Sequence, residues 1–297
     1  MIETLNVVKT FDGFRALDGL TMSVPKGSVY GLIGPNGAGK STIIRHLTGM
    51  YRPDSGSVTI DGQPVYENTD IKGRIGYIAD EVAYFPQATT EGMARFYEGI
   101  YPHFDRNLYQ KLGSVFNIDP KQPIKRLSRG MQKQVAFWLT IALRPDILIL
   151  DEPVDGLDPV MRRQIWTLLM DEVAQRESTI LISSHNLREL EDVCDHVGII
   201  GSGKMLLERD LSELQEKIVK VQVLLPEDTE FPADLPLVHL SASGNLKEAI
   251  LHCDAEEAKA RFIPCKPLYL ETIPLSLEEI FIYELGGNGY AIQDILV

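Results

Sequence analysis

Residues 34–42 combine glycines, a lysine and two hydroxyl side chains at a spacing suited to phosphate chemistry. Glycine lets successive backbone N–H groups turn toward phosphate oxygens, because no Cβ stands in the way. Lys40 adds a positive charge for β and γ phosphates, and Ser41 offers a hydroxyl oxygen to Mg²⁺. The nine residues are Gly34, Pro35, Asn36, Gly37, Ala38, Gly39, Lys40, Ser41 and Thr42.

The residues on either side predict the elements that position this loop. Residues 29–33 are apolar or small, as in a buried strand, and Ile43, Ile44 and Leu47 follow helical spacing until Gly49 and Pro53. A strand, a glycine-rich loop and a helix N-terminus form an anion site, since the helix dipole favours negative charge there. The alternative, a turn that binds nothing, is disfavoured by the complete nine-residue pattern.

Two adjacent carboxylates, Asp151 and Glu152, follow the apolar run 147–150. Carboxylates at the C-terminal end of a buried strand are costly unless they bind something, and that edge is where open α/β sheets place ligands. Asp151 suits Mg²⁺, and Glu152 suits orientation or deprotonation of an attacking water. The alternative is a capped loop without a ligand.

Three further residues have both a functional and a structural interpretation. Phe11, at the end of an early strand, can stack on a purine or pack in the core. Ser128 precedes a predicted helix, where it can face an anion or simply cap the helix. His185 follows the apolar run 179–184, so it can contact a ligand at the sheet edge or serve as a structural hydrogen-bonding group.

The bulk composition places limits on the class of protein. The chain has 297 residues, a formal net charge of −13 and three cysteines, Cys194, Cys253 and Cys265, in no metal-binding spacing. An acidic chain lacks the basic face that nucleic-acid binding needs. The sequence shows neither an apolar run of about 18 residues nor a signal-peptide start. These observations predict a cytoplasmic soluble protein that does not bind nucleic acid.

Residues outside these motifs predict the remaining organisation. Short strands are expected within 5–33, and a hairpin is expected around 58–62. Helical segments with eight aromatic residues follow between 84 and 116; most of these aromatics are expected in the core and some at a partner surface. In the C-terminal part, the alternation from Val219 to Leu225 predicts a strand, and Ser276–Glu279 predicts a helix-capping box.

Taken in chain order, residues 34–42, 127–131, 147–152 and 156–158, together with His185, resemble the ATP-binding subunit of an ABC transporter. The resemblance covers roughly residues 1–215. It implies an α/β P-loop NTPase fold of ABC type, with an antiparallel β subdomain and a helical subdomain at about 80–145. Residues 216–297 are then a small C-terminal α+β accessory domain.

The resemblance also implies a role for each matching residue, with ATP and Mg²⁺ as cofactors. Glu152, His185 and Lys40 are implied in catalysis, His185 as the switch residue that touches the γ-phosphate. Ser41, Asp151 and Asp80 are implied as Mg²⁺ ligands. The implied nucleotide contacts are Phe11 at adenine, the Walker A loop 34–42, Ser128 and Gly130 of the signature, and Asp158 of the D-loop.

The sequence departs from the family pattern at two places. The signature carries Arg129 and Met131 where the family has Gly and Gln, and Asp80 stands where the family has the Q-loop glutamine. These features look like the ABC-2-type exporter ATPases, including antibiotic-resistance members. The stretch 101–105 resembles a group found in operons run by GntR-type repressors, one of which is linked to acetoin uptake.

The resemblance implies specific partners and a location. Two subunits pair head to tail, as a homodimer or heterodimer, with each ATP between one Walker A loop and the other subunit's signature. A separately encoded integral membrane permease completes the transporter, which places the chain peripherally on the inner face of the cell membrane. The alternative is a non-transport ABC ATPase acting on nucleic acid or ribosomes; a kinase is disfavoured because His185 and residues 127–131 would have no role.

Overall fold

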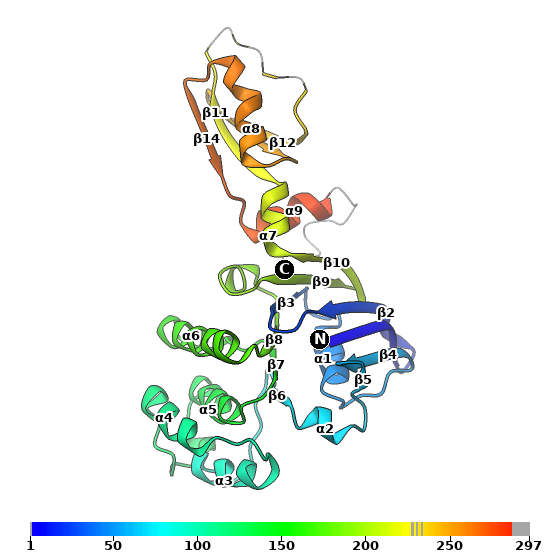
Figure 1. Ribbon diagram of the computed structural model, residues 1–297, viewed down its shortest axis with the longest axis vertical. Coiled ribbons are helices and arrows are strands. Elements are labelled where there is room, and N and C mark those ends of the chain that lie inside the picture. The colour runs from blue at the N-terminus through cyan, green and yellow to red at the C-terminus, as the bar shows by residue number, and fades with distance from the viewer. Residues whose placement is uncertain (1, 227–228, 230, 233, 287–297) are drawn as a thin grey trace. The chain divides into compact units, whose positions relative to one another are not determined.

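The structure is a computed structural model that describes residues 2–226, 229, 231–232 and 234–286 (Figure 1). The chain divides into two compact units. The first contains residues 1–185 and 196–208, and the second contains residues 186–195 and 209–297. Residues 287–297 of the expected accessory domain lie outside the described part.

The first unit is built on a six-stranded sheet with the order β10-β9-β3-β8-β7-β6. Its strands are β3 (Val29–Ile33), β6 (Ile75–Ile78), β7 (Ile147–Asp151), β8 (Thr179–Ser184), β9 (His196–Gly201) and β10 (Lys204–Asp210). From β9 to β6 all neighbours are parallel. Every residue of β3, β7 and β8 is buried, which explains why these strands are continuous apolar runs rather than alternating ones.

An antiparallel sheet with the order β2-β1-β4-β5 forms a second layer of this unit. Its strands are β1 (Ile2–Phe11), β2 (Phe14–Val24), β4 (Ser55–Ile60) and β5 (Gln63–Pro64). The expected hairpin around 58–62 is confirmed as the β4–β5 pair, with Asp61 and Gly62 both at positive φ in its turn. Helix α1 (Lys40–Leu47) contacts β2, β4 and β7, so its buried Ile43, Ile44 and Leu47 join the two sheets.

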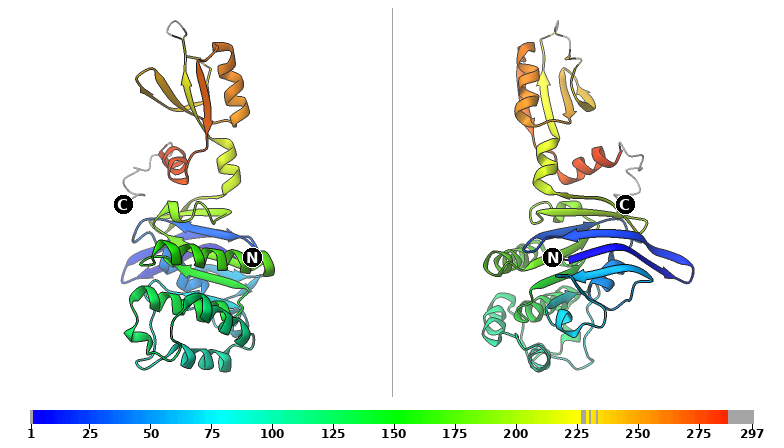
Figure 2. Two further views of the ribbon diagram at one scale, coloured as in Figure 1. Left: turned by 90° about the vertical axis from the view of Figure 1, so that its left-hand side faces the viewer. Right: turned by 45° about the vertical axis from the view of Figure 1, so that its right-hand side comes forward.

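Helices form the remainder of the first unit. They are α2 (Thr69–Lys72), α3 (Thr90–Ile100), α4 (Arg106–Phe116), the 3-10 turn η1 (Ile124–Arg126), α5 (Arg129–Ala142) and α6 (Pro159–Arg176). Figure 2 shows α3, α4 and α5 gathered in one helical group. Inside this group, Trp138 of α5 stacks on Tyr109, with ring centroids 4.9 Å apart, and donates a 2.6 Å hydrogen bond to the carbonyl of Tyr109.

The expectation that most aromatic residues from 84 to 116 are core residues is wrong. Only Tyr109 and Phe116 of these eight are buried, whereas Phe85 and Phe96 are 60% and 47% exposed. The reason is that α3 buries only a narrow stripe of small and medium side chains, Thr90, Met93 and Ala94. Of the aromatic residues within α3, Phe96 is therefore exposed and Tyr97 is half-buried.

The second unit contains a four-stranded sheet with the order β12-β13-β11-β14. Its elements are η2 (Leu187–Glu189), α7 (Leu211–Lys217), β11 (Val219–Leu224), β12 (Leu237–Ser243), β13 (Leu246–Leu251), α8 (Ala255–Phe262), η3 (Ile263–Cys265), β14 (Tyr269–Ile273) and α9 (Leu277–Gly286). Alternate residues of β11, Val221 and Val223, pack with Phe262 of α8 in its core.

The segment 186–195 belongs to this second unit, although it lies far from residue 215, where the sequence places the boundary. Two hydrogen bonds tie it there: the Leu277 N–H donates to Glu191, and the Leu211 N–H donates to the carbonyl of Asp195. The predicted capping box at the start of α9 is confirmed, because Ser276 and Glu279 exchange backbone-to-side-chain hydrogen bonds at 3.0 and 3.3 Å. No helix in the described residues is long and apolar enough to cross a bilayer.

Candidate functional site

The loop between β3 and α1 is shaped by its glycines. Gly37 and Gly39 have φ values of 81° and 111°, which residues with a Cβ rarely adopt. A Cβ on Gly39 would also stand 2.9 Å from the carbonyl oxygen of Ala16. The loop therefore turns sharply into the N-terminus of α1, where backbone N–H groups lack partners within the helix.

Lys40 is the first residue of α1 and is only 6% exposed. Its Nζ donates hydrogen bonds of 2.5 Å to the carbonyl of Gly34 and 3.3 Å to the carbonyl of Pro35. The lysine is thus bent back over its own loop. This posture holds the ammonium at the place where phosphate oxygens would meet the loop.

A cavity of about 450 Å³ opens above this loop. Its lining includes residues 35–37 and 39–42, together with Phe11, Phe14, Ala16, Arg45, Tyr51, Asp80 and Glu152. Phe11 is 38% exposed and its ring centroid lies 5.4 Å from that of Tyr51, so aromatic side chains form one rim of the cavity. The sequence singled out Phe11 but not Phe14 or Tyr51, because neither residue belongs to a recognisable motif.

Asp151, the last residue of β7, is buried, with 4% of its surface exposed. The Ser183 hydroxyl of neighbouring β8 donates a 2.6 Å hydrogen bond to Asp151 Oδ1. Burial and the charge of Asp151 raise the pKa of nearby Tyr77 to about 12. A neutral hydroxyl does not balance a buried carboxylate, so this position is suited to a cation.

The carboxylate of Glu152 lies between two other candidate site residues, Lys40 and His185. Its Oε1 lies 3.5 Å from Lys40 Nζ, and its Oε2 lies 3.0 Å from Nδ1 of His185. These three residues follow β7, β3 and β8, which are adjacent in the sheet, so their C-terminal ends meet at one edge. Asp155, which the sequence did not single out, brings a carboxylate within 4.8 Å of ligand atoms of Glu152 and His185.

Ser128, Gly130 and Asp158 lie outside the set of described residues that line the cavity. Ser128 is the N-cap of α5 and accepts the N–H of Met131 at 3.2 Å, while Asp158 caps α6 in the same way. A Cβ on Gly130 would stand 2.9 Å from the carbonyl oxygen of Gly156, so α5 approaches the 155–157 turn closely. The structure therefore gathers Lys40, Glu152 and His185 but leaves the signature residues facing elsewhere.

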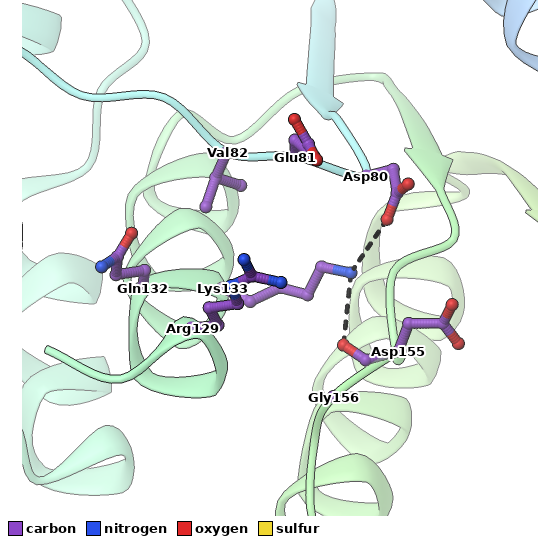
Figure 3. Close-up of a pocket in the computed structure, with 8 residues that line it drawn as sticks. All are labelled: Asp80, Glu81, Val82, Arg129, Gln132, Lys133, Asp155 and Gly156. Atoms are coloured by element: carbon purple, nitrogen blue, oxygen red, sulfur yellow. Dashed lines mark hydrogen bonds and ion pairs between the residues drawn. The ribbon is translucent and has the colours of Figure 1, made fainter.

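Asp80 follows β6 and lines the same cavity as the loop. Its side chain is 56% exposed, and its Oδ1 lies 3.8 Å from Nζ of Lys133 on α5. Figure 3 shows Lys133 extended from α5 between Asp80 and the backbone at Asp155. Lys133 is buried, and burial lowers its pKa. No sequence pattern points to Lys133, since a lysine within a helix is most often solvated.

Comparisons with known proteins agree with this architecture. The profile of the family described as "ABC transporter" matches residues 17–155. The chain is 31% identical to the ABC transporter ATP-binding protein YtrB of Bacillus subtilis, over 97% of this chain and 99% of that protein. It is 35% identical to the lantibiotic transport ATP-binding protein SrtF of Streptococcus pyogenes, over 75% and 98% of the two chains.

A solved structure of an ATP-binding subunit of an ABC transporter superposes with a TM-score of 0.67. That alignment has 26% identity and covers 72% of this chain and 92% of the other. Both the fold and the near full-length sequence match to YtrB lead to the same family. The chain belongs to the ABC transporter ATP-binding proteins, as a subunit that binds and hydrolyses ATP.

Proposed function

We propose that ATP binds in the cavity around Lys40 and that Glu152 acts on the water that attacks its γ-phosphate. The observation that carries this proposal is the position of the Glu152 carboxylate between Lys40 and His185, 3.5 and 3.0 Å away. A carboxylate held at both oxygens is oriented before substrate arrives, as a general base must be. Lys40 then offsets phosphate charge, and His185 is in reach of the terminal phosphate.

Mg²⁺ fits the oxygen donors of this site, because hard cations prefer hydroxyl and carboxylate ligands. Ser41, Asp151 and Asp80 are the residues proposed to hold it. The buried Asp151, whose hydrogen bond comes from the uncharged Ser183, supports this assignment. When bound, the ion would neutralise part of the triphosphate charge; binding and orientation of the nucleotide belong to Phe11, the loop and Lys40.

The working unit is proposed to be a head-to-tail dimer, of two identical or two related subunits. The loop covers one side of the phosphates, whereas Ser128 and Gly130 lie outside its cavity. A second subunit can present Ser128, Gly130 and the N-terminus of its α5 to the side of the phosphates that the loop does not cover. Asp158 lies at the N-terminus of another helix, α6, and is proposed to contact the nucleotide from there. ATP would then hold the dimer together, and hydrolysis would release it.

The membrane permease is proposed to dock on an aromatic surface of the helical subdomain. This surface consists of the exposed Phe85, Phe96 and Ile100, with the half-buried Tyr97 beside Phe96, and the rings of Phe85 and Phe96 pack edge to face at 5.8 Å. Exposed aromatic clusters of this kind are typical of protein interfaces. Docking there would place the chain on the inner face of the membrane and beside Asp80.

One purification tests this function. Tagged chain is isolated from detergent-solubilised membranes of its own organism, with and without ATP and Mg²⁺, and bound proteins are identified. An integral membrane protein that is recovered at a stable ratio supports the transporter. Recovery with ribosomes or nucleic acid, and without a membrane protein, would contradict it.

A further inference from the structure

Lys133 is a buried cation that joins three separate segments of the first unit. Its side chain is 6% exposed. Its Nζ donates a 2.6 Å hydrogen bond to the carbonyl of Glu152 and a 3.4 Å hydrogen bond to the carbonyl of Asp155, and lies 3.8 Å from Asp80 Oδ1. An ammonium group has three N–H donors, so each of the three partners can take one of them.

The carbonyl of Glu152 belongs to a strained residue. Glu152 has a φ of 45°, a conformation that residues with a Cβ rarely adopt because the Cβ approaches the following carbonyl oxygen. Two groups hold it there: its N–H donates to the backbone carbonyl and the hydroxyl of Ser183, both at 3.2 Å, and its carbonyl accepts from Lys133. Lys133 therefore helps fix the peptide that aims the Glu152 carboxylate at Lys40 and His185.

Asp80 is the exposed partner of the buried Lys133. The Asp80 side chain lines both the nucleotide cavity and a second cavity of about 490 Å³, which Figure 3 shows around Lys133. Because Asp80 is 56% exposed and faces open space, it can approach or leave the ammonium without a steric clash. When it leaves, the charge of Lys133 is shared by the two carbonyls alone.

We propose that Lys133 is a positioning residue. Whether the Asp80 carboxylate lies beside the Lys133 ammonium or away from it determines how strongly Lys133 holds the backbone carbonyls of Glu152 and Asp155. The proposal rests on the hydrolytic role proposed for Glu152. Lys133 is not a catalytic residue in this scheme, since it reaches the reacting atoms only through Glu152. The glutamine expected at position 80 in the family carries no charge, so an ion pair with Lys133 is specific to the aspartate found here.

A double-mutant cycle tests the link. The variants are Asp80→Asn, Lys133→Gln and their combination, with Lys133→Met as a more severe change. For the wild type and each variant, kcat and KM are measured with Mg-ATP. The affinity for a fluorescent ATP analogue and the melting temperature are measured as well. Lys125→Met, which removes an exposed lysine from neighbouring η1, is the matched control.

Lys133→Met is expected to lower kcat by about tenfold or more, while KM and analogue affinity change by less than about twofold, because only the transition-state geometry is lost. Lys133→Gln retains N–H donors for the carbonyls, so its kcat should fall less. Asp80→Asn is expected to change kcat by about two- to fivefold in the wild-type background, as contacting residues usually couple. In the Lys133→Gln background the same substitution should have a smaller effect, because only the Mg²⁺ contact proposed for Asp80 is then left to lose.

Equal effects of Asp80→Asn on kcat in both backgrounds would overturn the proposal. A Lys133→Gln variant with both a lower affinity for the ATP analogue and a lower melting temperature would also overturn it. Glu152→Gln, assayed in parallel, reports on the proposed hydrolytic site separately. Wild-type turnover in that variant would remove Glu152 from the mechanism. If Glu152→Gln reduces turnover but the effects of Asp80→Asn and Lys133→Gln on kcat are additive, only the link through Lys133 is rejected.

Discussion

Glu152 Oε1 lies 3.5 Å from Nζ of Lys40, so the end of β7 and the start of α1 share one ion pair in the lining of the cavity above residues 34–42. Each residue is nearly buried, with side-chain exposures of 12% and 6%. The pair sets the position of a carboxylate and of an ammonium for which we propose different tasks toward the same phosphates. Replacing either residue should therefore produce a different defect.

Glu152→Gln is expected to cut ATP turnover by about a hundredfold or more and to leave nucleotide binding intact. Glutamine keeps the size and hydrogen bonding of glutamate but removes the base. With ATP, the variant should elute as a dimer on size exclusion, and without nucleotide as a smaller species. A monomer in saturating ATP, with binding demonstrated, would contradict the sandwich arrangement.

Lys40→Ala is expected to abolish detectable ATP binding, since the only cation that contacts the loop carbonyls of Gly34 and Pro35 in the described structure is lost. Binding is measured by equilibrium titration with a fluorescent ATP analogue. Lys26→Ala serves as control, because Lys26 lies in the turn before β3 and outside the lining of the cavity. Wild-type affinity in Lys40→Ala would show that the phosphates bind elsewhere.

Phe11→Ala is expected to weaken ATP binding by roughly five- to a hundredfold, because a base stacked on an aromatic ring gains about 1–3 kcal/mol. The loss of affinity should be smaller for inorganic triphosphate, which has no base to stack. Leu5→Ala, an exposed position on the same strand, should bind ATP normally. Unchanged ATP affinity in Phe11→Ala would assign this ring to packing against Tyr51.

Asp54 gives a pH-dependent prediction for the strand that carries Phe11. Hydrogen bonds from the Lys9 ammonium and the Thr10 N–H lower the pKa of Asp54 from its usual value. A carboxyl with a lowered folded-state pKa stabilises the fold above its unfolded-state pKa, and this contribution disappears as the pH falls through the folded-state value. The melting-temperature difference between wild type and Asp54→Asn, measured by thermal unfolding from about pH 7 to about pH 3, should thus narrow below about pH 4; a difference that stays constant over this range would contradict the prediction.

Phe96→Glu is expected to abolish stimulation of ATPase activity by the reconstituted permease while the basal rate of the isolated chain stays within about twofold, since a buried charge at an interface is costly. Val115→Glu, at an exposed position of α4 in the same helical group, is the control. Full stimulation of Phe96→Glu would place the docking surface elsewhere.

The sequence was sufficient for the features that local patterns encode. The strand, loop and helix around Lys40, the hairpin at Asp61–Gly62 and the capping box at Ser276 all follow from turn chemistry and periodicity, and the structure confirms these elements. The α/β fold of ABC type is confirmed as well. The proximity of Glu152 and His185 could be expected because parallel strands bring their ends to one edge.

Features that depend on tertiary neighbours could not be predicted. The burial of Lys133, the positive φ of Glu152 and the placement of Tyr51 beside Phe11 arise from contacts between segments far apart in the chain. The exposed aromatics of α3 were misjudged for the same reason. Their number predicts a core, but α3 buries only Thr90, Met93 and Ala94, so Phe96 stays exposed.

The order of strands in the six-stranded sheet has a consequence for partial unfolding. β3, β8 and β7 are interior strands, whereas β6, which leads to Asp80, has one sheet neighbour in the described structure. Terminal strands usually open at lower free energy than central ones. Amide protons of β6 should therefore exchange with solvent before those of β3, β7 and β8. In mild denaturant, Asp80 should move away from the site while Lys40, Glu152 and His185 keep their contacts with one another.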